Sequence, residues 1–445
     1  MSSVLTDRQR DELYVHNTLT RTRHKSVLEY LHASGLLETF QALKREVQLD
    51  TYVPDSKSKY AGLLEKKWLS TIRLQKKNME LSAKVSELEA ELQSAPSARR
   101  SASVADWYPR VPPRHTLLGH RQPITSVAFH PTFSLVASAS EDCCIKIWDW
   151  ETGELEQTLK GHTKPIQSLA FDHAGQYLVS CSSDLSTKLW DGNDGWKNIR
   201  TLHGHDHSVS SVLFMPGDQH IATASRDKSI KLWETSTGFC SRTFMGHDDW
   251  VRAIVASSDG RWLASGSSDQ SVRIWEVASG EVRHELRGHE HVVECVAFAP
   301  MTAYENIRLL GAIPQAKDDP SASQPGQYLA SGSRDKTVRL WSQQGHCVRV
   351  LHGHDNWVRS IAFSPNGKFL LSVSDDKTMR VWDLATARCL KVVECHSHFV
   401  TCLAWGRSRV DVNAKAGATV SEKDLQPVNV VATGSVDLSL KIWAP

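Results

Sequence analysis

Four residue types that can carry out chemistry together recur seven times along the chain. The seven sets are His120, Ser138, Asp142, Trp148; His162, Ser180, Asp184, Trp190; His205, Thr223, Asp227, Trp233; His247, Ser265, Asp269, Trp275; His289, Ser331, Asp335, Trp341; His354, Ser372, Asp376, Trp382; and His396, Thr433, Asp437, Trp443. Serine, histidine and aspartate can form a hydrolase triad, and several histidines and aspartates can hold a metal ion. Both chemistries have to be weighed against a structural role.

The spacing within the sets favours the structural role. The aspartate follows the histidine by 22 residues in five sets. In all seven sets, the tryptophan follows the aspartate by six residues and the hydroxyl residue precedes it by four. An enzyme needs one nucleophile rather than seven, and metal ligands must converge on one point. Because the sequence also lacks GxSxG, P-loop and HExxH motifs, we predict a protein that is not an enzyme and that has no metal site and no cofactor.

The elements that must position these residues are short β-strands. A Gly-His pair opens six of the sets, and Cys395-His396 opens the seventh. A repeat of about 42 residues that runs from Gly-His through Asp to Trp is typical of a four-stranded propeller blade. Residues 110–445 resemble WD-repeat propellers, and the resemblance implies a buried network of His, Ser or Thr, Asp and Trp in each blade. We predict a mainly β fold: a seven-bladed WD-repeat β-propeller over residues 113–445, preceded by an α-helical LisH and coiled-coil dimerisation region.

Two further features concern the ring itself. The chain stops after Trp443, one strand short of a full blade, while residues 114–118 form a spare strand before the first blade. We therefore expect residues 114–118 to close the last blade, which leaves no free sheet edge. Residues 301–326 and 407–427 are insertions rich in polar and turn-forming residues, and we expect two surface loops on the same face of the ring.

The first fifty residues resemble a LisH dimerisation motif. "RQRDEL" at residues 8–13 is followed by "KSVLEYLHASGLLETFQALKREVQ", which predicts two helices broken at Gly35. The apolar positions expected to make the dimer are Leu28, Leu31, Leu36 and Phe40. So short a pair of helices needs a second copy to bury its apolar face. Residues 14–23 separate the two parts of the motif and interrupt the predicted first helix, and the sequence alone does not say what this insert does to the LisH fold.

Residues 57–93 predict a short coiled coil. Apolar or asparagine side chains recur at heptad spacing in two rows: Leu74, Leu81 and Leu88, and Asn78, Val85 and Leu92. An asparagine at an a position favours two strands in register. The alternative is a single amphipathic helix that folds back on the propeller. Residues 94–112 then predict a flexible linker.

Composition excludes several classes of protein. The 445 residues contain 52 Lys and Arg against 50 Asp and Glu, a net charge of +2. This balance argues against a nucleic-acid-binding protein. The chain holds no apolar run of the ~18 residues that a membrane helix needs, so we predict no membrane insertion. The N-terminus is polar and the nine cysteines form no CxxC pair, which predicts a cytoplasmic protein with free thiols.

The order of LisH motif, coiled coil, linker and propeller resembles the lissencephaly-type nuclear distribution proteins. The segments "GHDHSVSSVLFMPGDQHIATASRDKSIKLWE" and "HVVECVAFAP" carry this resemblance within the blades. It implies a homodimeric, non-catalytic regulator of cytoplasmic dynein that acts in nuclear migration and spindle positioning. The partners implied are the dynein heavy chain and a nuclear distribution E-type coiled-coil protein, at microtubule plus ends and spindle poles. The alternative is a LisH–propeller scaffold of another complex, such as a ubiquitin-ligase receptor or a corepressor.

The sequence also predicts which face of the ring binds a partner. In a propeller, the loops after Gly-His and the turns around the blade aspartate open on one face. The residues expected there are Arg226, Trp250, Arg252, Arg334, Trp357, Arg359 and Lys377. Arginine and tryptophan dominate the energetics of protein interfaces. By resemblance, Arg226, Arg252, Arg334, Trp357 and Lys377 match positions that contact the dynein motor, whereas any one of them alone could be a solvated loop charge.

Overall fold

The computed structural model describes residues 24–49, 52–54, 75–79, 81–84, 107–311, 324–410 and 426–445. The chain divides into two compact units, Met1–Arg99 and Arg100–Pro445. No described helix has both the length and the apolar character that crossing a membrane requires.

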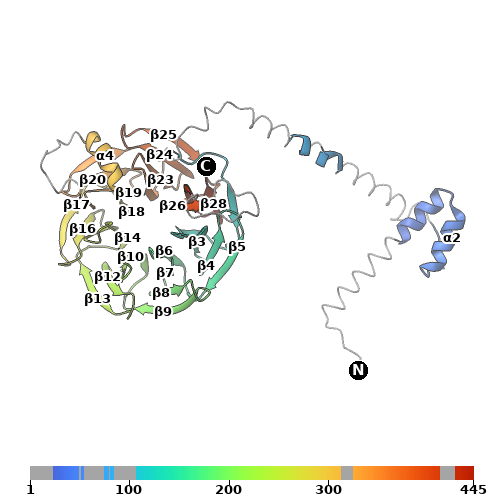
Figure 1. Ribbon diagram of the computed structural model, residues 1–445, viewed down its shortest axis with the longest axis horizontal. Helices are drawn as coiled ribbons and strands as arrows, with labels where there is room; N and C mark the ends of the chain where they lie inside the picture. The colour runs from blue at the N-terminus through green and yellow to red at the C-terminus, as the bar shows by residue number, and fades with distance from the viewer. Residues whose placement is uncertain are drawn as a thin grey trace, which may run out of the picture. The chain divides into compact units, whose positions relative to one another are not determined.

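The second unit is a ring of seven four-stranded antiparallel sheets (Figure 1). Blade 1 contains β2 (Ile124–Phe129), β3 (Leu135–Ser140), β4 (Cys144–Asp149) and β5 (Leu155–Lys160). Blade 2 contains β6 (Ile166–Phe171), β7 (Tyr177–Ser182), β8 (Ser186–Asp191) and β9 (Lys197–His203). Blade 3 contains β10 (Val209–Phe214), β11 (His220–Ser225), β12 (Ser229–Glu234) and β13 (Cys240–Met245). Blade 4 contains β14 (Val251–Ala256), β15 (Trp262–Ser267), β16 (Val272–Glu276) and β17 (Val282–Leu286).

The remaining three blades complete the ring. Blade 5 contains β18 (Val293–Phe298), β19 (Tyr328–Ser333), β20 (Val338–Ser342) and β21 (Cys347–Leu351). Blade 6 contains β22 (Val358–Phe363), β23 (Phe369–Ser374), β24 (Thr378–Asp383) and β25 (Cys389–Glu394). Blade 7 contains β26 (Val400–Val410), β27 (Gln426–Ser435), β28 (Ser439–Trp443) and β1 (His115–Leu118). The predicted seven-bladed β-propeller is confirmed.

Burial differs between the strands of a blade and explains their composition. The second strands are buried on both sides, so they hold small or apolar residues, as in "LVASAS" of β3. The fourth strands, such as β5, are largely exposed and correspondingly polar. The apolar core is divided into seven clusters, and each lies at the seam between two neighbouring blades. The blades are therefore held together by burial between sheets rather than by one central core.

The ring is closed by the strand that the sequence left unassigned. β1 pairs antiparallel with β28, with His115 opposite Ile442 and Leu118 opposite Ser439. Leu117 is buried in the core cluster between blades 7 and 1. The prediction that residues 114–118 complete the last blade is confirmed, and it places the first and last strands of the propeller in one sheet.

The described parts of the two insertions contain regular secondary structure. The first begins with a 3-10 helix, η3 (Met301–Ala303), and an α-helix, α4 (Tyr304–Leu310). Asn306 donates a hydrogen bond to the carbonyl of Gly367 at 3.0 Å, and Ile307 is fully buried. The prediction of a loop is wrong for these residues because the insertion packs on the turn of the next blade. In the second insertion, residues 407–410 extend β26 and pair with residues 426–429 of β27.

The last part of the predicted linker packs on the propeller. Trp107 lies edge-on to Trp405, with ring centroids 6.2 Å apart, and Tyr108 lies edge-on to Phe369 at 5.5 Å. Both rings join the core cluster between blades 6 and 7. The prediction of a flexible linker that extends to residue 112 is therefore wrong for its last residues, because two aromatic side chains anchor the chain from residue 107 onward.

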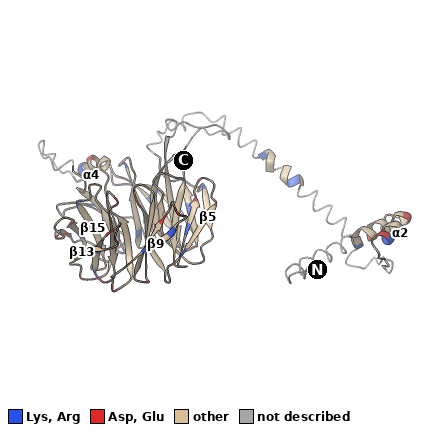
Figure 2. Cartoon of the chain, turned by 60° about the horizontal axis from the view of Figure 1, so that its bottom comes forward, with Lys and Arg blue, Asp and Glu red and all other residues tan. Residues whose placement is uncertain are grey.

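Within its described residues, the first unit has two short helices between residues 24 and 46 and further helical segments at residues 75–79 and 81–84. Residues 24–33 form the first, and α2 (Leu37–Glu46) the second, with a left-handed Gly35 (φ 75°) between them, so the predicted break at Gly35 is confirmed. α2 has acidic Glu38 in its first turn and basic Lys44 in its last, the arrangement that the helix dipole favours. Figure 2 shows acidic and basic residues on α2. The predicted insert, residues 14–23, lies outside the described residues.

Candidate partner-binding site

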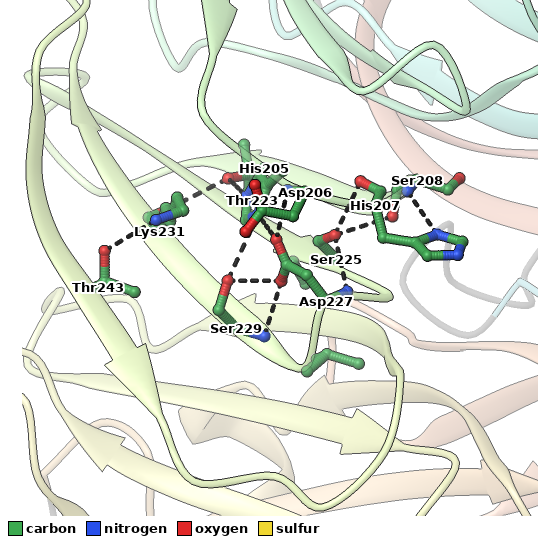
Figure 3. A network of polar contacts seen from close by, with 12 residues as sticks. His205, Asp206, His207, Ser208, Thr223, Ser225, Asp227, Ser229, Lys231 and Thr243 are labelled. Carbon is green, nitrogen blue, oxygen red and sulfur yellow. Dashed lines mark hydrogen bonds and ion pairs between the residues drawn. The ribbon is translucent and has the colours of Figure 1, made fainter.

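Each of the seven sets forms one hydrogen-bonded network inside its blade. The histidine Nδ1 lies 2.7–3.1 Å from the aspartate carboxylate, and its Nε2 lies 2.7–2.9 Å from the hydroxyl oxygen. The indole N–H donates to the same hydroxyl oxygen at 2.8–3.0 Å. Figure 3 shows the network around His205, Thr223 and Asp227 in blade 3.

The network fixes the proton positions as well as the side chains. An ionised Asp227 only accepts hydrogen bonds, so Nδ1 of His205 carries a proton toward it. With a neutral ring, Nε2 accepts the hydroxyl hydrogen of Thr223, whose oxygen accepts the Trp233 N–H. Burial raises the pKa of Asp227, but hydrogen bonds from His205 and Ser229 outweigh it, so the pKa lies below its ordinary value. Every polar atom is satisfied, as a buried network requires.

Glycine before the histidine is explained by the indole. A Cβ on Gly246 would lie 3.0 Å from the Trp275 ring and 2.8 Å from Arg273 Nη1. Cys395 replaces this glycine in blade 7, and there the His396 to Asp437 separation is the longest of the seven, 3.1 Å. The seven networks lie in seven separate blades and do not converge on one point. Among the described residues, no group of three or more His, Cys, Asp or Glu side chains is placed to hold a metal ion.

The predicted docking residues lie at one end of the blades. Trp250 and Trp357 stand directly before the inner strands β14 and β22, and Arg226 and Arg334 stand directly after the second strands β11 and β19. Because neighbouring strands are antiparallel, the start of the first strand and the end of the second meet at the same end of a blade. Trp405 and Phe369, which hold the linker, lie further toward the opposite end, because Phe369 begins β23 and Trp405 is the sixth residue of β26, opposite Val431.

One part of this surface is built around Trp250. The guanidinium of Arg226 from blade 3 lies 4.9 Å from the Trp250 ring centre, and that of Arg252 lies 5.3 Å away. Both distances fall within the range of a cation–π interaction. Nε of Arg252 donates to the Ser268 hydroxyl at 3.1 Å, and the His207 ring lies 5.9 Å from Trp250. This half therefore joins blades 3 and 4.

The other part is built in the same way around Trp357. Arg334 from blade 5 lies 4.1 Å from the Trp357 ring centre, and Arg359 lies 5.0 Å from it. Here carboxylates accompany the arginines. Nε of Arg334 donates to Glu294, and Nε of Arg359 donates to Asp375 at 2.9 Å. This half joins blades 5 and 6.

We call these six side chains, Arg226, Trp250, Arg252, Arg334, Trp357 and Arg359, the Arg–Trp cluster. The two halves differ in charge. Burial lowers the pKa of Arg252; Glu294 opposes this shift, and neighbouring arginines add to it. Burial also acts to lower the pKa of Arg359, but Asp375 and Glu294 outweigh it and raise that pKa. The arginines around Trp357 therefore contact carboxylates directly, whereas Arg252 beside Trp250 is bonded to a hydroxyl and feels the Glu294 charge only from a distance.

Sequence reasoning missed the carboxylates of this surface. Glu294 and Asp375 were not among the predicted residues, yet they lie among the arginines with side chains that are 10% and 3% exposed. A signal was present: Glu294 is the second residue of its inner strand, the position that Arg252 and Arg359 occupy in theirs. Lys377 is exposed on the turn that carries Asp375, but among the described residues no contact joins it to the Arg–Trp cluster.

The same strand position has a different role elsewhere in the ring. The hydroxyls of Thr125, Ser210 and Thr401 donate to backbone carbonyls of the next blade's inner strand. These residues link neighbouring blades. In blades 4, 5 and 6 this position holds charged side chains instead, so the surface is confined to one part of the ring.

The predicted dimerisation residues divide into three groups. Leu28 and Phe40 are buried within one chain and Leu31 is half-buried, so these three do not need a second copy to leave water. Leu36 (51%) and Leu81 (52%) are exposed, as is Leu37 (56%), the neighbour of Leu36, and Asn78 is exposed as well. The remaining positions, Leu74, Val85, Leu88 and Leu92, lie outside the described residues.

Comparison with known proteins agrees with this architecture. The family "WD domain, G-beta repeat" matches residues 112–149, 153–191, 196–234, 238–276, 321–342 and 345–383. The seventh blade falls outside these matches, although it forms a sheet like the others. The family "PAC1 LisH domain" matches residues 7–52, a range that includes residues 14–23.

Full-length relatives also match. The chain is 61% identical over 452 residues to the nuclear distribution protein PAC1 of Mycosarcoma maydis, covering 100% of this chain and 98% of that protein. It is 59% identical over 450 residues to the protein of the same name from Cryptococcus neoformans var. neoformans, with both chains fully covered. Identity to the protein of that name from Gibberella zeae is 45% over 472 residues, again with full coverage of both.

Proposed function

Because this chain belongs to the family of PAC1 nuclear distribution proteins, we propose that it is a non-catalytic regulator of cytoplasmic dynein in nuclear migration and spindle positioning. One face of the propeller binds the motor domain of the dynein heavy chain. The protein acts in the cytoplasm on the microtubule cytoskeleton, at plus ends and spindle poles, and a nuclear distribution E-type coiled-coil protein is a second partner.

The observation that carries the proposal is the Arg–Trp cluster. Four arginines from four blades lie over two tryptophans on one surface of a chain whose net charge is only +2. None of the six belongs to a blade network, so the fold does not need them for the role that fixes the other tryptophans. Half-buried tryptophan and arginine side chains held in place before binding are typical of interface hot spots.

The N-terminal unit supports a homodimer. Leu36 and Leu37 form an exposed apolar surface at the start of α2, and Leu81 is exposed on the helical segment of residues 81–84. Exposed leucines on such short helices are stabilised by a second copy, because its apolar surface removes them from water. Two propellers in one dimer raise the effective concentration of one docking surface once the other is bound.

Substitution of Arg252 by alanine tests the proposal. Arg252→Ala removes one cation over Trp250, and we expect the affinity for the dynein motor domain to fall about 5- to 150-fold, corresponding to 1–3 kcal/mol. Arg283→Ala is the matched control, because Arg283 is an exposed arginine on β17 of the same blade and lies outside the cluster. Equal binding by both variants and the native protein, in a titration at fixed salt, would remove the Arg–Trp cluster from the interface.

Asp269→Ala provides the opposite case. Asp269 accepts from the His247 ring, from the backbone N–H of Asp248, and from both the backbone N–H and the hydroxyl of Ser271. We expect this variant to melt earlier while the folded fraction binds the motor domain normally, since no cluster residue is altered. If Arg252→Ala and Asp269→Ala changed melting and binding in the same way, the separation between scaffold and docking residues would be wrong.

A further inference from the structure

Glu294 occupies an unusual place in the Arg–Trp cluster. Its carboxylate accepts from Nε of Arg334 and lies 3.8 Å from Nη1 of Arg359. Both arginines also stack on Trp357. The Glu294 side chain is only 10% exposed and the Arg334 side chain 18%. A carboxylate so placed sets the direction of two guanidinium groups before any partner arrives.

The half around Trp250 has no equivalent carboxylate contact. Arg252 is hydrogen-bonded to the neutral Ser268 hydroxyl. Nε of Arg226 is buried and has no hydrogen-bond partner among the described residues. The two stacks therefore share one construction, a tryptophan under two arginines, and differ in whether an acid fixes the arginines. This contrast within one surface indicates two different tasks in binding.

We propose that Glu294 is the positioning residue of the Arg–Trp cluster: it holds Arg334 and Arg359 around Trp357 as a rigid, charge-compensated anchor. The half around Trp250, where no ion pair to a carboxylate is found among the described residues, supplies the positive charge that attracts the partner. The inference rests on the proposed function for the identity of the partner. Unpaired surface charge mainly raises the rate of association, and fixed, desolvated contacts mainly lower the rate of dissociation. Removing Glu294 therefore accelerates both steps.

Glu294→Gln separates the two effects, with Asp248→Asn as its matched control. Both changes remove one negative charge from the same surface and so raise its net charge by one. Asp248, however, is 76% exposed beside Arg273 and touches none of the cluster arginines. In full-length protein binding the dynein motor domain at low salt, we expect both variants to associate about 1.5- to 2-fold faster. Only Glu294→Gln dissociates faster, by about fivefold, because only there is the anchor released.

A second measurement uses the free protein and does not depend on the partner. Phenylglyoxal modifies accessible arginines, and peptide mass spectrometry gives a rate for Arg334 relative to Arg283, an exposed arginine outside the cluster, in the same sample. We expect this ratio to rise at least threefold in Glu294→Gln and to stay at the native value in Asp248→Asn. Glu294→Asp keeps the charge but shortens the side chain, so the ratio rises while the association rate stays native.

The outcomes decide between distinct failures. A native Arg334 ratio in a folded Glu294→Gln variant overturns the positioning role, as does a dissociation rate equal to that of Asp248→Asn. Should the native protein fail to bind the motor domain, the proposed function falls, while the modification ratio still tests whether Glu294 holds Arg334. Melting curves of all three variants establish that each is folded under the assay conditions.

Discussion

Replacing Thr223 by valine removes one hydroxyl from the blade 3 network and leaves the side-chain volume almost unchanged (Figure 3). The Thr223 hydroxyl lies 2.7 Å from Nε2 of His205 and 2.8 Å from the indole nitrogen of Trp233. His205 is 6% exposed and Trp233 is 4% exposed, so water does not replace the lost partner. Two buried polar groups are left unpaired in the valine variant, at a cost of about 1–3 kcal/mol each, or about 2–6 kcal/mol together.

Thr223→Ser is the control, because it keeps the hydroxyl and removes only a buried methyl group, which costs about 1 kcal/mol. A domain of this size has an unfolding entropy of about 0.7 kcal/mol per kelvin. We therefore expect scanning calorimetry at a fixed scan rate to show a Tm lower by about 3–8 °C for Thr223→Val and by about 1–2 °C for Thr223→Ser. A valine variant as stable as the serine variant would refute the claim that hydrogen bonding in these networks stabilises the blades.

Three further predictions concern ring closure, pH and dimerisation. Deleting residues 1–118 removes β1 and exposes β28 as a sheet edge, so we expect aggregation on size-exclusion chromatography, whereas deleting residues 1–106 leaves a soluble propeller. Burial lowers the pKa of His130, whose Nδ1 accepts a hydrogen bond from the backbone, so the neutral ring stabilises the fold. This contribution to stability is complete above pH 6.5 and is lost as the pH falls through the folded pKa. The Tm of the native protein should therefore drop more between pH 7 and 5 than that of His130→Asn, and parallel curves would contradict this. Placing charges in the predicted helical seam by Leu81→Asp with Leu88→Asp should give a monomer in light scattering, and a persistent dimer would assign the interface to the LisH helices alone.

The repeated part of the molecule could be predicted from the sequence because its interactions are local. In every network the hydroxyl residue, the aspartate and the tryptophan keep the same separations, and in five of the seven the histidine precedes the aspartate by 22 residues, as in His247 and Asp269. A hydrogen-bonded unit of this length leaves the same pattern of residue types every time it recurs. The closing strand followed from the same logic, since a spare strand at one end and a missing strand at the other satisfy each other's backbone groups.

Features that lie between blades depended on the tertiary structure. The carboxylate of Glu294 among the arginines, the anchoring of Trp107 on Trp405, and the packing of α4 on the turn at Gly367 all join segments from different parts of the chain. Such contacts cannot be predicted from a fixed spacing in the sequence, because they depend on how neighbouring sheets are placed and on which rotamers fill the seam between them. The sequence alone therefore determined that seven like blades form a ring, through interactions repeated within each blade. Only the tertiary structure decided which side chains of different blades meet, because burial and charge at a seam are properties of two surfaces in contact.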